Sequence, residues 1–289
     1  MVTEKWKETV SQTIADARGA SRNELDFELS EMDDEMAEYV AQALEDDWEQ
    51  QLQESWFFLE VSFNDFRSRG AVAFAKTIGK QTTHLIEFES CTNHITSAGA
   101  VAIAQHCLAV PNCRLGGLNL DHNPIESEGV IALANALATN TTLDSLTLPR
   151  WLCRDAAQAL GAALRTNSTL RDLSFDTCHH LEDAECVRHL AEGLVHNKGL
   201  RTLSMPRCNI SDSGFRHLWE ALRTNQSLRH LQLHRNNIGD EGMTLIAEAL
   251  QRQAESIETE DTIPDRSKGL PGKIGKRELS LRSSCRVAV

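Results

Sequence analysis

The sequence lacks several features that would identify an enzyme or a membrane protein. It has no run of about 20 apolar residues, so no membrane-spanning helix is predicted. Its first residues, MVTEKWKETVSQ, have no apolar core of the signal-peptide kind. It contains neither a GxxxxGK[ST] nor a GxGxxG phosphate loop, and no GxSxG nucleophile motif. We therefore expect a cytoplasmic, non-enzymatic protein with no cofactor and no membrane contact.

Paired cysteines are also missing. The eight cysteines stand at positions 91, 107, 113, 153, 178, 186, 208 and 285, without a CxxC pair. This spacing indicates neither a zinc site nor a disulfide framework. In the cytoplasm the thiols would stay reduced.

Basic residues are scarce, and the charge is uneven along the chain. The net charge is −13 and the isoelectric point is near 5.3. Residues 1–54 hold 16 acids and 4 bases, whereas residues 266–289 hold 7 bases and one acid. Nucleic-acid binding usually needs a basic face, so the composition argues against it. It favours a partner that is neutral or basic.

What the sequence does contain is an internal repeat. Seven copies follow one another in steps of 27 to 30 residues. Numbered 1 to 7, they start at Trp56, Leu85, Leu115, Leu143, Leu170, Leu200 and Leu228. Each opens with an LxxLxL pattern, whose alternation predicts a short strand. The repeat accounts for most of the chain and therefore decides the fold.

The second half of each copy predicts a helix. Apolar residues four positions apart place one buried stripe on a helix. These pairs are Leu133 and Leu137, Leu160 and Leu164, Leu190 and Leu194, Leu218 and Leu222, and Ile246 and Leu250. A strand and a helix of this size cannot bury their apolar faces alone, but stacked copies can.

The pattern LxxLxLxx[N/C]xIxxxGxxxLxxAL, almost complete in copies 3, 6 and 7, resembles the leucine-rich repeat family in its ribonuclease-inhibitor-like subtype. The resemblance covers about residues 55–253. It implies an α/β fold, a curved solenoid or horseshoe with parallel strands on the concave face and helices on the convex face. Trp151 and Cys178 replace the asparagine in copies 4 and 5. The family also uses cysteine there, so Trp151 is the real departure and predicts a local opening or bulge.

The open face of the sheet is where we look for function. Counting the first leucine as position 1, positions 3, 5 and 7 point away from the core, and position 8 adjoins them. Acids dominate the first five copies, and basic residues the end of the array. The candidate partner-binding residues are Glu60, Glu87, Glu89, Asp121, Asp172, Asp176, Arg207, His230, His234 and Arg235. Two interpretations stay open: an ordinary solvated face, or a surface that binds a protein with a basic patch.

Few aromatic side chains are available to anchor a partner on this face. Phe58 and Phe63 fall at its N-terminal end, and Trp151 falls near its middle. Aromatic anchors commonly dominate protein interfaces. Their scarcity leaves charge as the main feature of the predicted face.

Two polar stretches look like chemical sites. In LNLDHNPIESEG (118–129), Asp121 and His122 could form a catalytic pair, but no nucleophile accompanies them. A calcium loop needs a further oxygen ligand where Ile125 stands. The repeat instead predicts that Asn123 bonds backbone between neighbouring copies. It also makes Asp121 one member of an acidic row rather than a partner of His122.

The stretch DTCHHLEDAEC (176–186) has residue types that can bind zinc. The repeat, however, assigns Cys178 to the interior. His179 and His180 fall in a lengthened loop. We therefore expect a variable surface loop, with a metal site as the alternative.

Three regions are predicted along the chain. Residues 1–54 form an acidic helical region and N-terminal cap, in which Met36, Val40 and Leu44 mark a capping helix. Residues 55–253 form the array of seven repeats. Residues 254–289 form a flexible linker followed by a basic tail or an edge strand, and this alternative stays open.

These observations predict a monomeric, non-enzymatic scaffold that binds a protein partner on its concave face. The resemblance to the family leaves two alternatives. The protein could regulate an enzyme, as a small-GTPase activator or a ribonuclease inhibitor does, or it could be a cytoskeletal or ciliary adaptor.

Overall fold

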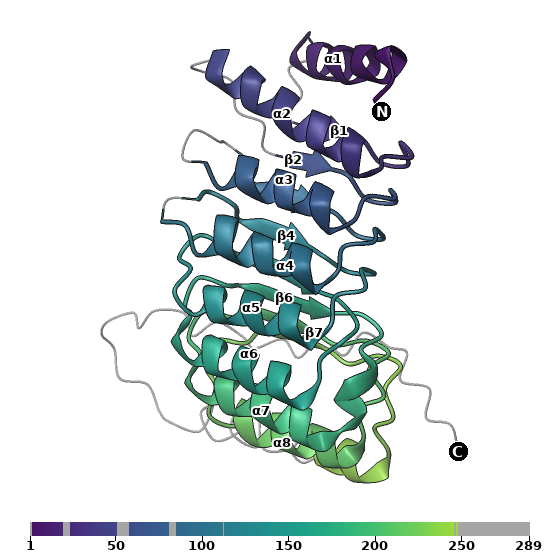
Figure 1. Ribbon diagram of the computed structural model, residues 1–289. Coiled ribbons are helices and arrows are strands. Elements are labelled where there is room, and N and C mark those ends of the chain that lie inside the picture. Colours follow the sequence, from purple (N-terminus) through teal and green to yellow (C-terminus); the bar gives the residue numbers. More distant parts are fainter. Residues whose placement is uncertain are drawn as a thin grey trace, which may run out of the picture.

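The structure of the protein is a computed structural model that describes residues 2–19, 24–50, 58–80, 85–111, 113–245 and 247. Strands and helices alternate along this part of the chain (Figure 1). No helix within it is long and apolar enough to cross a membrane. The predicted tail at 254–289 and the helical pair Ile246 and Leu250 lie outside the residues whose side chains are described.

The strands form one open parallel sheet, in which each strand pairs with the next one along the chain. This order is the one that stacked repeats require, and the α/β repeat fold is confirmed. The strands are β1 (Glu24–Asp26), β2 (Phe58–Glu60), β3 (Glu87–Glu89), β4 (Gly117–Asn119), β5 (Ser145–Leu148), β6 (Asp172–Phe175), β7 (Thr202–Ser204) and β8 (His230–Gln232).

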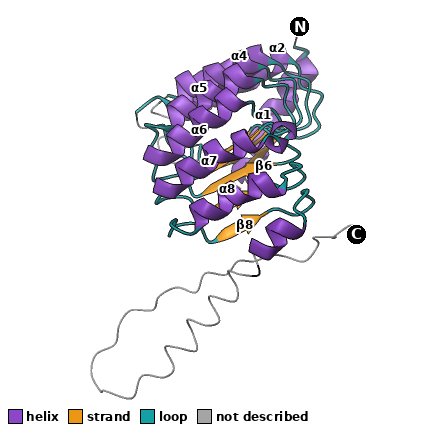
Figure 2. Cartoon of the chain, turned by 90° about the horizontal axis from the view of Figure 1, so that it is seen from below, coloured by secondary structure: helices purple, strands orange, loops and turns teal. Residues whose placement is uncertain are grey.

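The helices from residue 34 onward line the outer side of the stack, and the sheet forms its inner side (Figure 2). The first helix instead packs against the N-terminal helix and strand of the stack. Each repeat helix packs against the next. They are α1 (Glu4–Gly19), α2 (Asp34–Gln50), α3 (Ser68–Ile78), α4 (Ser97–Ile103), the π-helical turn η1 (Ala104–Leu108), α5 (Ser127–Leu137), α6 (Arg154–Thr166), the 3₁₀ turn η2 (His179–Glu182), α7 (Ala184–His196) and α8 (Asp212–Leu222).

Every strand turns its position-4 side chain into the core. Strand pairing brings these residues into one row across the sheet, and each is at most 5% exposed. The row consists of Leu25, Leu59, Phe88, Leu118, Leu146, Leu173, Leu203 and Leu231. Because side chains alternate along a strand, positions 3 and 5 face away from the helices. The predicted open face therefore exists as a continuous surface.

The sheet begins earlier than the repeat pattern predicts. Strand β1 pairs in register with β2, with Leu25 opposite Leu59. In the segment ELDFEL, Leu25 and Phe27 are buried while the residues between and beside them are exposed. The helix at 34–50 follows this strand, as a helix follows each later strand. The N-terminal region therefore contributes a strand as well as helices, and the three domain boundaries stay predictions.

Asn123 joins neighbouring copies, as the sequence predicts. It is 4% exposed. Its Nδ2 donates to the carbonyl oxygens of Ser90 at 2.9 Å and Leu120 at 3.1 Å. Its Oδ1 accepts the backbone N–H of Ile95 at 3.0 Å. Asn64 and Asn236 bond the backbone of the preceding copy in the same way.

A second set of buried asparagines follows the helices. Asn167 donates to the carbonyl oxygens of Leu137 at 2.8 Å and Asn140 at 2.9 Å in the preceding copy. Asn197 and Asn225 repeat the arrangement, and none of these asparagines is more than 7% exposed. Three of them, Asn140, Asn167 and Asn225, begin an N-x-[ST] pattern, which has a structural explanation because the amide is used inside the fold.

Candidate functional site

The N-terminal half of the open face is acidic. Glu87 is exposed, and Glu60 and Glu89 are half-buried, all on the face that the repeat predicts. Strand β1 adds Glu24 and Asp26 at the same two positions, although the sequence predicts a helical region there. The alternating apolar residues of ELDFEL are the signal that could have revealed it.

We refer to Glu24, Asp26, Glu60, Glu87 and Glu89 as the acidic face. Among the described residues, no lysine, arginine or histidine occupies position 3 or 5 of strands β1 to β4. None of the five carboxylates makes an ion pair with another described residue. Their charge is therefore not neutralised within the part of the chain that the structure describes.

The pKa of Glu89 reflects the crowding of acidic groups on this face. Burial raises the pKa of its carboxyl above the ordinary value. A hydrogen bond with Asn119 lowers the pKa, and the neighbouring charges of Glu60 and Glu87 raise it again. A cation placed beside Glu89 would offset both the cost of burying its charge and the repulsion from Glu60 and Glu87.

Replacing Glu89 by glutamine is expected to raise the thermal midpoint at pH 7. The folded-state pKa of Glu89 is raised, so ionising it costs the folded protein stability above that pKa. This cost disappears as the pH falls below the ordinary carboxyl pKa, because both states are then protonated. The advantage of Glu89→Gln should therefore shrink between pH 7 and about pH 4 in calorimetry. An advantage that stays constant with pH would contradict this explanation.

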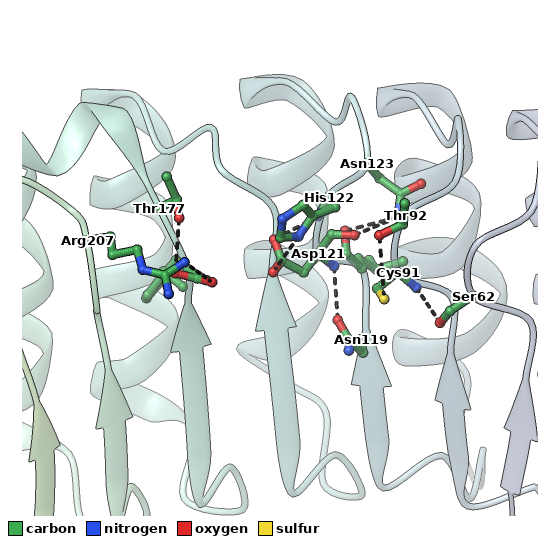
Figure 3. A network of polar contacts seen from close by, with 12 residues as sticks. Ser62, Cys91, Thr92, Asn119, Asp121, His122, Asn123, Thr177 and Arg207 are labelled. Carbon is green, nitrogen blue, oxygen red and sulfur yellow. Dashed lines mark hydrogen bonds and ion pairs between the residues drawn. The ribbon is translucent and has the colours of Figure 1, made fainter. Parts of the chain in front are cut away.

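Asp121 is placed differently from the expectation. It is only 8% exposed, and its Oδ2 lies 2.8 Å from Nδ1 of His122 (Figure 3). Its Oδ1 also accepts the backbone N–H of His122 at 2.7 Å. Burial raises the pKa of the Asp121 carboxyl, and the interactions with His122 lower it. His122 is thus the partner of Asp121, contrary to the expectation, and Asp121 is less available than the acidic face.

The remaining predicted site residues lie in the C-terminal half of the sheet. Asp172 and Asp176 are half-buried, and Oδ2 of Asp176 lies 3.9 Å from Nη1 of Arg207. Arg207, His230 and Arg235 are exposed, and His234 is half-buried. The predicted site residues therefore fall into an N-terminal and a C-terminal group on the open side, and their roles in binding stay predictions.

The stretch 176–186 does not converge on a metal. Cys178 is fully buried, and burial raises the pKa of its thiol to about 11. The His180 ring instead packs against Trp151, with the ring centroids 5.2 Å apart. No group of three metal-ligating side chains comes together anywhere in the described ranges. His179 and His180 lie in the 3₁₀ turn η2, where His179 is exposed and His180 is half-buried.

Two segments of the chain match the family model described as Leucine Rich repeat, residues 118–134 and residues 224–247. The first covers most of β4 and most of α5, and the second includes β8. The curated protein sequences give no significant match. Among solved structures, "Leiomodin-1 Actin-Binding Site 2 (ABS2)" is similar at 18% identity and a TM-score of 0.37, over 64% of this chain and 80% of that chain.

The two matched segments carry the same strand, asparagine and helix that recur through the stack. Asn123 and Asn236 lie in them and make equivalent bonds to the preceding copy. The chain therefore has the α/β fold of a leucine-rich-repeat solenoid, in which the copies stack on one another.

Proposed function

We propose that this protein is a non-enzymatic scaffold that holds a protein partner, through a basic patch, on its acidic face. The observation that carries the proposal is the set of five unneutralised carboxylates on adjacent strands. Neighbouring strands lie about 4.8 Å apart, so these charges share one small surface. Complementary charge increases the rate and the specificity of association.

The open sheet geometry also supports this role. The face presents short, regularly spaced strands whose backbone is held by neighbouring copies, so its side chains are preorganised. Phe63 and Leu29 adjoin the acids, with 47% and 70% of their surface exposed. They offer apolar contact next to the charged positions. A basic partner segment with an apolar residue would fit both features.

Charge reversal of the acidic face tests the proposal. The variant Glu60→Lys, Glu87→Lys, Glu89→Lys is expected to weaken binding of a fluorescent oligo-lysine peptide at least about tenfold, because it turns attraction into repulsion. The control variant Glu8→Lys, Glu128→Lys, Asp155→Lys changes the net charge equally on exposed helical positions. It should leave the affinity nearly unchanged.

The same three proteins serve as baits for affinity capture and mass spectrometry from cells. A cognate partner should be recovered by the wild type and the control and lost with the face variant. Equal recovery by all three would refute the use of this face. A partner recovered by the wild type and the control but not by the face variant should also bind more weakly at high salt.

The finer assignments remain proposals. The ribonuclease-inhibitor-like subtype is supported by repeat steps of 27 to 30 residues and by a helix after the strand in copies 1 to 6. Regulation of a small GTPase or a ribonuclease, and an adaptor role in the cytoskeleton or cilium, are alternatives. Measuring GTP hydrolysis by a captured GTPase with and without this protein separates regulation from tethering.

A further inference from the structure

Copies 4 and 5 have loops of unequal length after their strands. From the last core residue of the strand to the buried leucine or isoleucine that closes the turn, copy 3 takes five steps, from Leu120 to Ile125. Copy 4 takes four steps to Leu152, and copy 5 takes six steps to Leu181. The shorter loop of copy 4 leaves no buried position for a residue that would bond the neighbouring copy as Asn123 does in copy 3. Trp151 therefore lies outside, 46% exposed, instead of filling the position of Asn123.

The regular hydrogen bonding of the loops is interrupted at the same place. In other copies the position-8 N–H donates to the next copy, as from Thr92 to Asp121 at 3.0 Å and from Thr177 to Pro206 at 3.1 Å. Neither equivalent bond forms from copy 3 to 4 or from copy 4 to 5, whose residues are all described. His122 instead donates to its own neighbour's carboxylate. Trp151 thus lies where the hydrogen bonding between the loops of neighbouring copies is interrupted, and its ring packs against that of His180.

Three arginines follow this edge of the sheet. Arg150, Arg207 and Arg235 all occupy position 8 of their copies, where the strands end. Arg150 and Arg235 make no ion pair with any described residue, and Arg207 makes only the 3.9 Å contact with Asp176. The Nε of Arg150 is buried without a hydrogen-bond acceptor. A buried donor of this kind costs free energy until an acceptor reaches it.

We propose that the Trp151 edge, defined as Arg150, Trp151, His180, Arg207 and Arg235, is a second docking surface. Its occupant is an acidic protein segment with an apolar residue among its acids. The charge of this edge is opposite to that of the acidic face, so the two surfaces select different partners or different parts of one partner. The inference goes beyond the proposed function and does not depend on it.

The contacts indicate what each group does. Trp151 offers the apolar anchor that most often dominates a protein interface. The arginines offer planar donors that match carboxylates. Arg150 and Arg207 stand two strands apart, about 10 Å, which an extended peptide covers in about three residues. Acids about three residues apart around an apolar side chain would therefore meet both arginines.

Fluorescence anisotropy with a fluorescein-labelled oligo-glutamate peptide containing one central phenylalanine tests this surface. Wild type should bind the peptide, and Trp151→Ala should weaken binding at least about tenfold. The triple variant Arg150→Glu, Arg207→Glu, Arg235→Glu should weaken it at least about tenfold and reduce its dependence on salt. Arg165→Glu is the control, because Arg165 is exposed on α6 of the same copy.

Further variants keep the result decisive. Trp151→Phe should retain most of the affinity, and circular dichroism establishes that each variant is folded. The lysine variant of the acidic face should bind the oligo-glutamate peptide at least as well as wild type does. The proposal is overturned if wild type does not bind the peptide, or if Trp151→Ala and the arginine variant bind it like the control. It is also overturned if oligothymidine binds this edge and the peptide does not.

Discussion

Replacing Asn123 by alanine is expected to lower the free energy of unfolding by about 3 kcal/mol. The change removes the donor to Ser90 and Leu120 and the acceptor of the Ile95 N–H. These backbone groups lie at a buried junction, where each unsatisfied group costs about 1–3 kcal/mol. Urea unfolding followed by circular dichroism measures the loss.

Two further variants locate the cause. Asn119→Ala, in the same copy, removes a half-buried side chain that accepts the Asp121 N–H at 3.0 Å, and should cost only about 1 kcal/mol. Asn123→Cys should recover part of the loss. Cys208 fills the equivalent position, and its Sγ lies 3.2 Å from the Pro206 carbonyl oxygen. Equal effects of Asn123→Ala and Asn119→Ala would argue against the bonds between Asn123 and the preceding copy as the source of stability.

Replacing Gly193 by alanine is expected to cost about 2 kcal/mol, against the normal preference of helices. In an ordinary helix interior this change stabilises by about 1 kcal/mol. Here a Cβ on Gly193 would lie 2.3 Å from the carbonyl oxygen of Gly161. The obstacle is backbone of the neighbouring helix, so α6 and α7 would have to move apart. The steric cost therefore exceeds the gain in helix propensity.

Gly116→Ala is the control for this prediction. The nearest atom to its added Cβ would be the side-chain Cγ2 of Ile86 at 3.3 Å, which can shift slightly. We expect a change within about 0.5 kcal/mol. Urea unfolding of both variants gives the comparison. A Gly193→Ala protein more stable than wild type would show that the helices tolerate separation.

Much of the fold follows from periodicity. The alternation in LxxLxL and the four-residue spacing of the helical leucines are local patterns, so each unit can be predicted from its own residues. The recurring Asn123 position predicted the bond between copies, and the structure confirms it. Strand β1 escaped prediction because its copy lacks the leading leucine and the asparagine, leaving only Leu25 and Phe27 in alternation.

The candidate site was less predictable. Glu60, Glu87 and Glu89 follow from their place in the repeat, because position alone decides which face a strand residue takes. The neighbours that modify each charge come from other copies or from loops. The raised pKa of Glu89 depends on Glu60 and Glu87 as well as on its own burial. The pairing of Asp121 with His122 depends on the loop's conformation, in which His122 has a φ of 56°.

The sequence by itself determined the repeating strand and helix, their stacking order and the alternation that separates core from open face. These depend on local periodicity and on the need of each unit to cover its apolar side. Only the tertiary structure decided that residues 24–26 extend the sheet, that Asp121 is buried against His122, and that Trp151 points outward. The reason is physical: a loop one residue shorter or longer changes which of its side chains are buried only when the neighbouring copies are stacked against it.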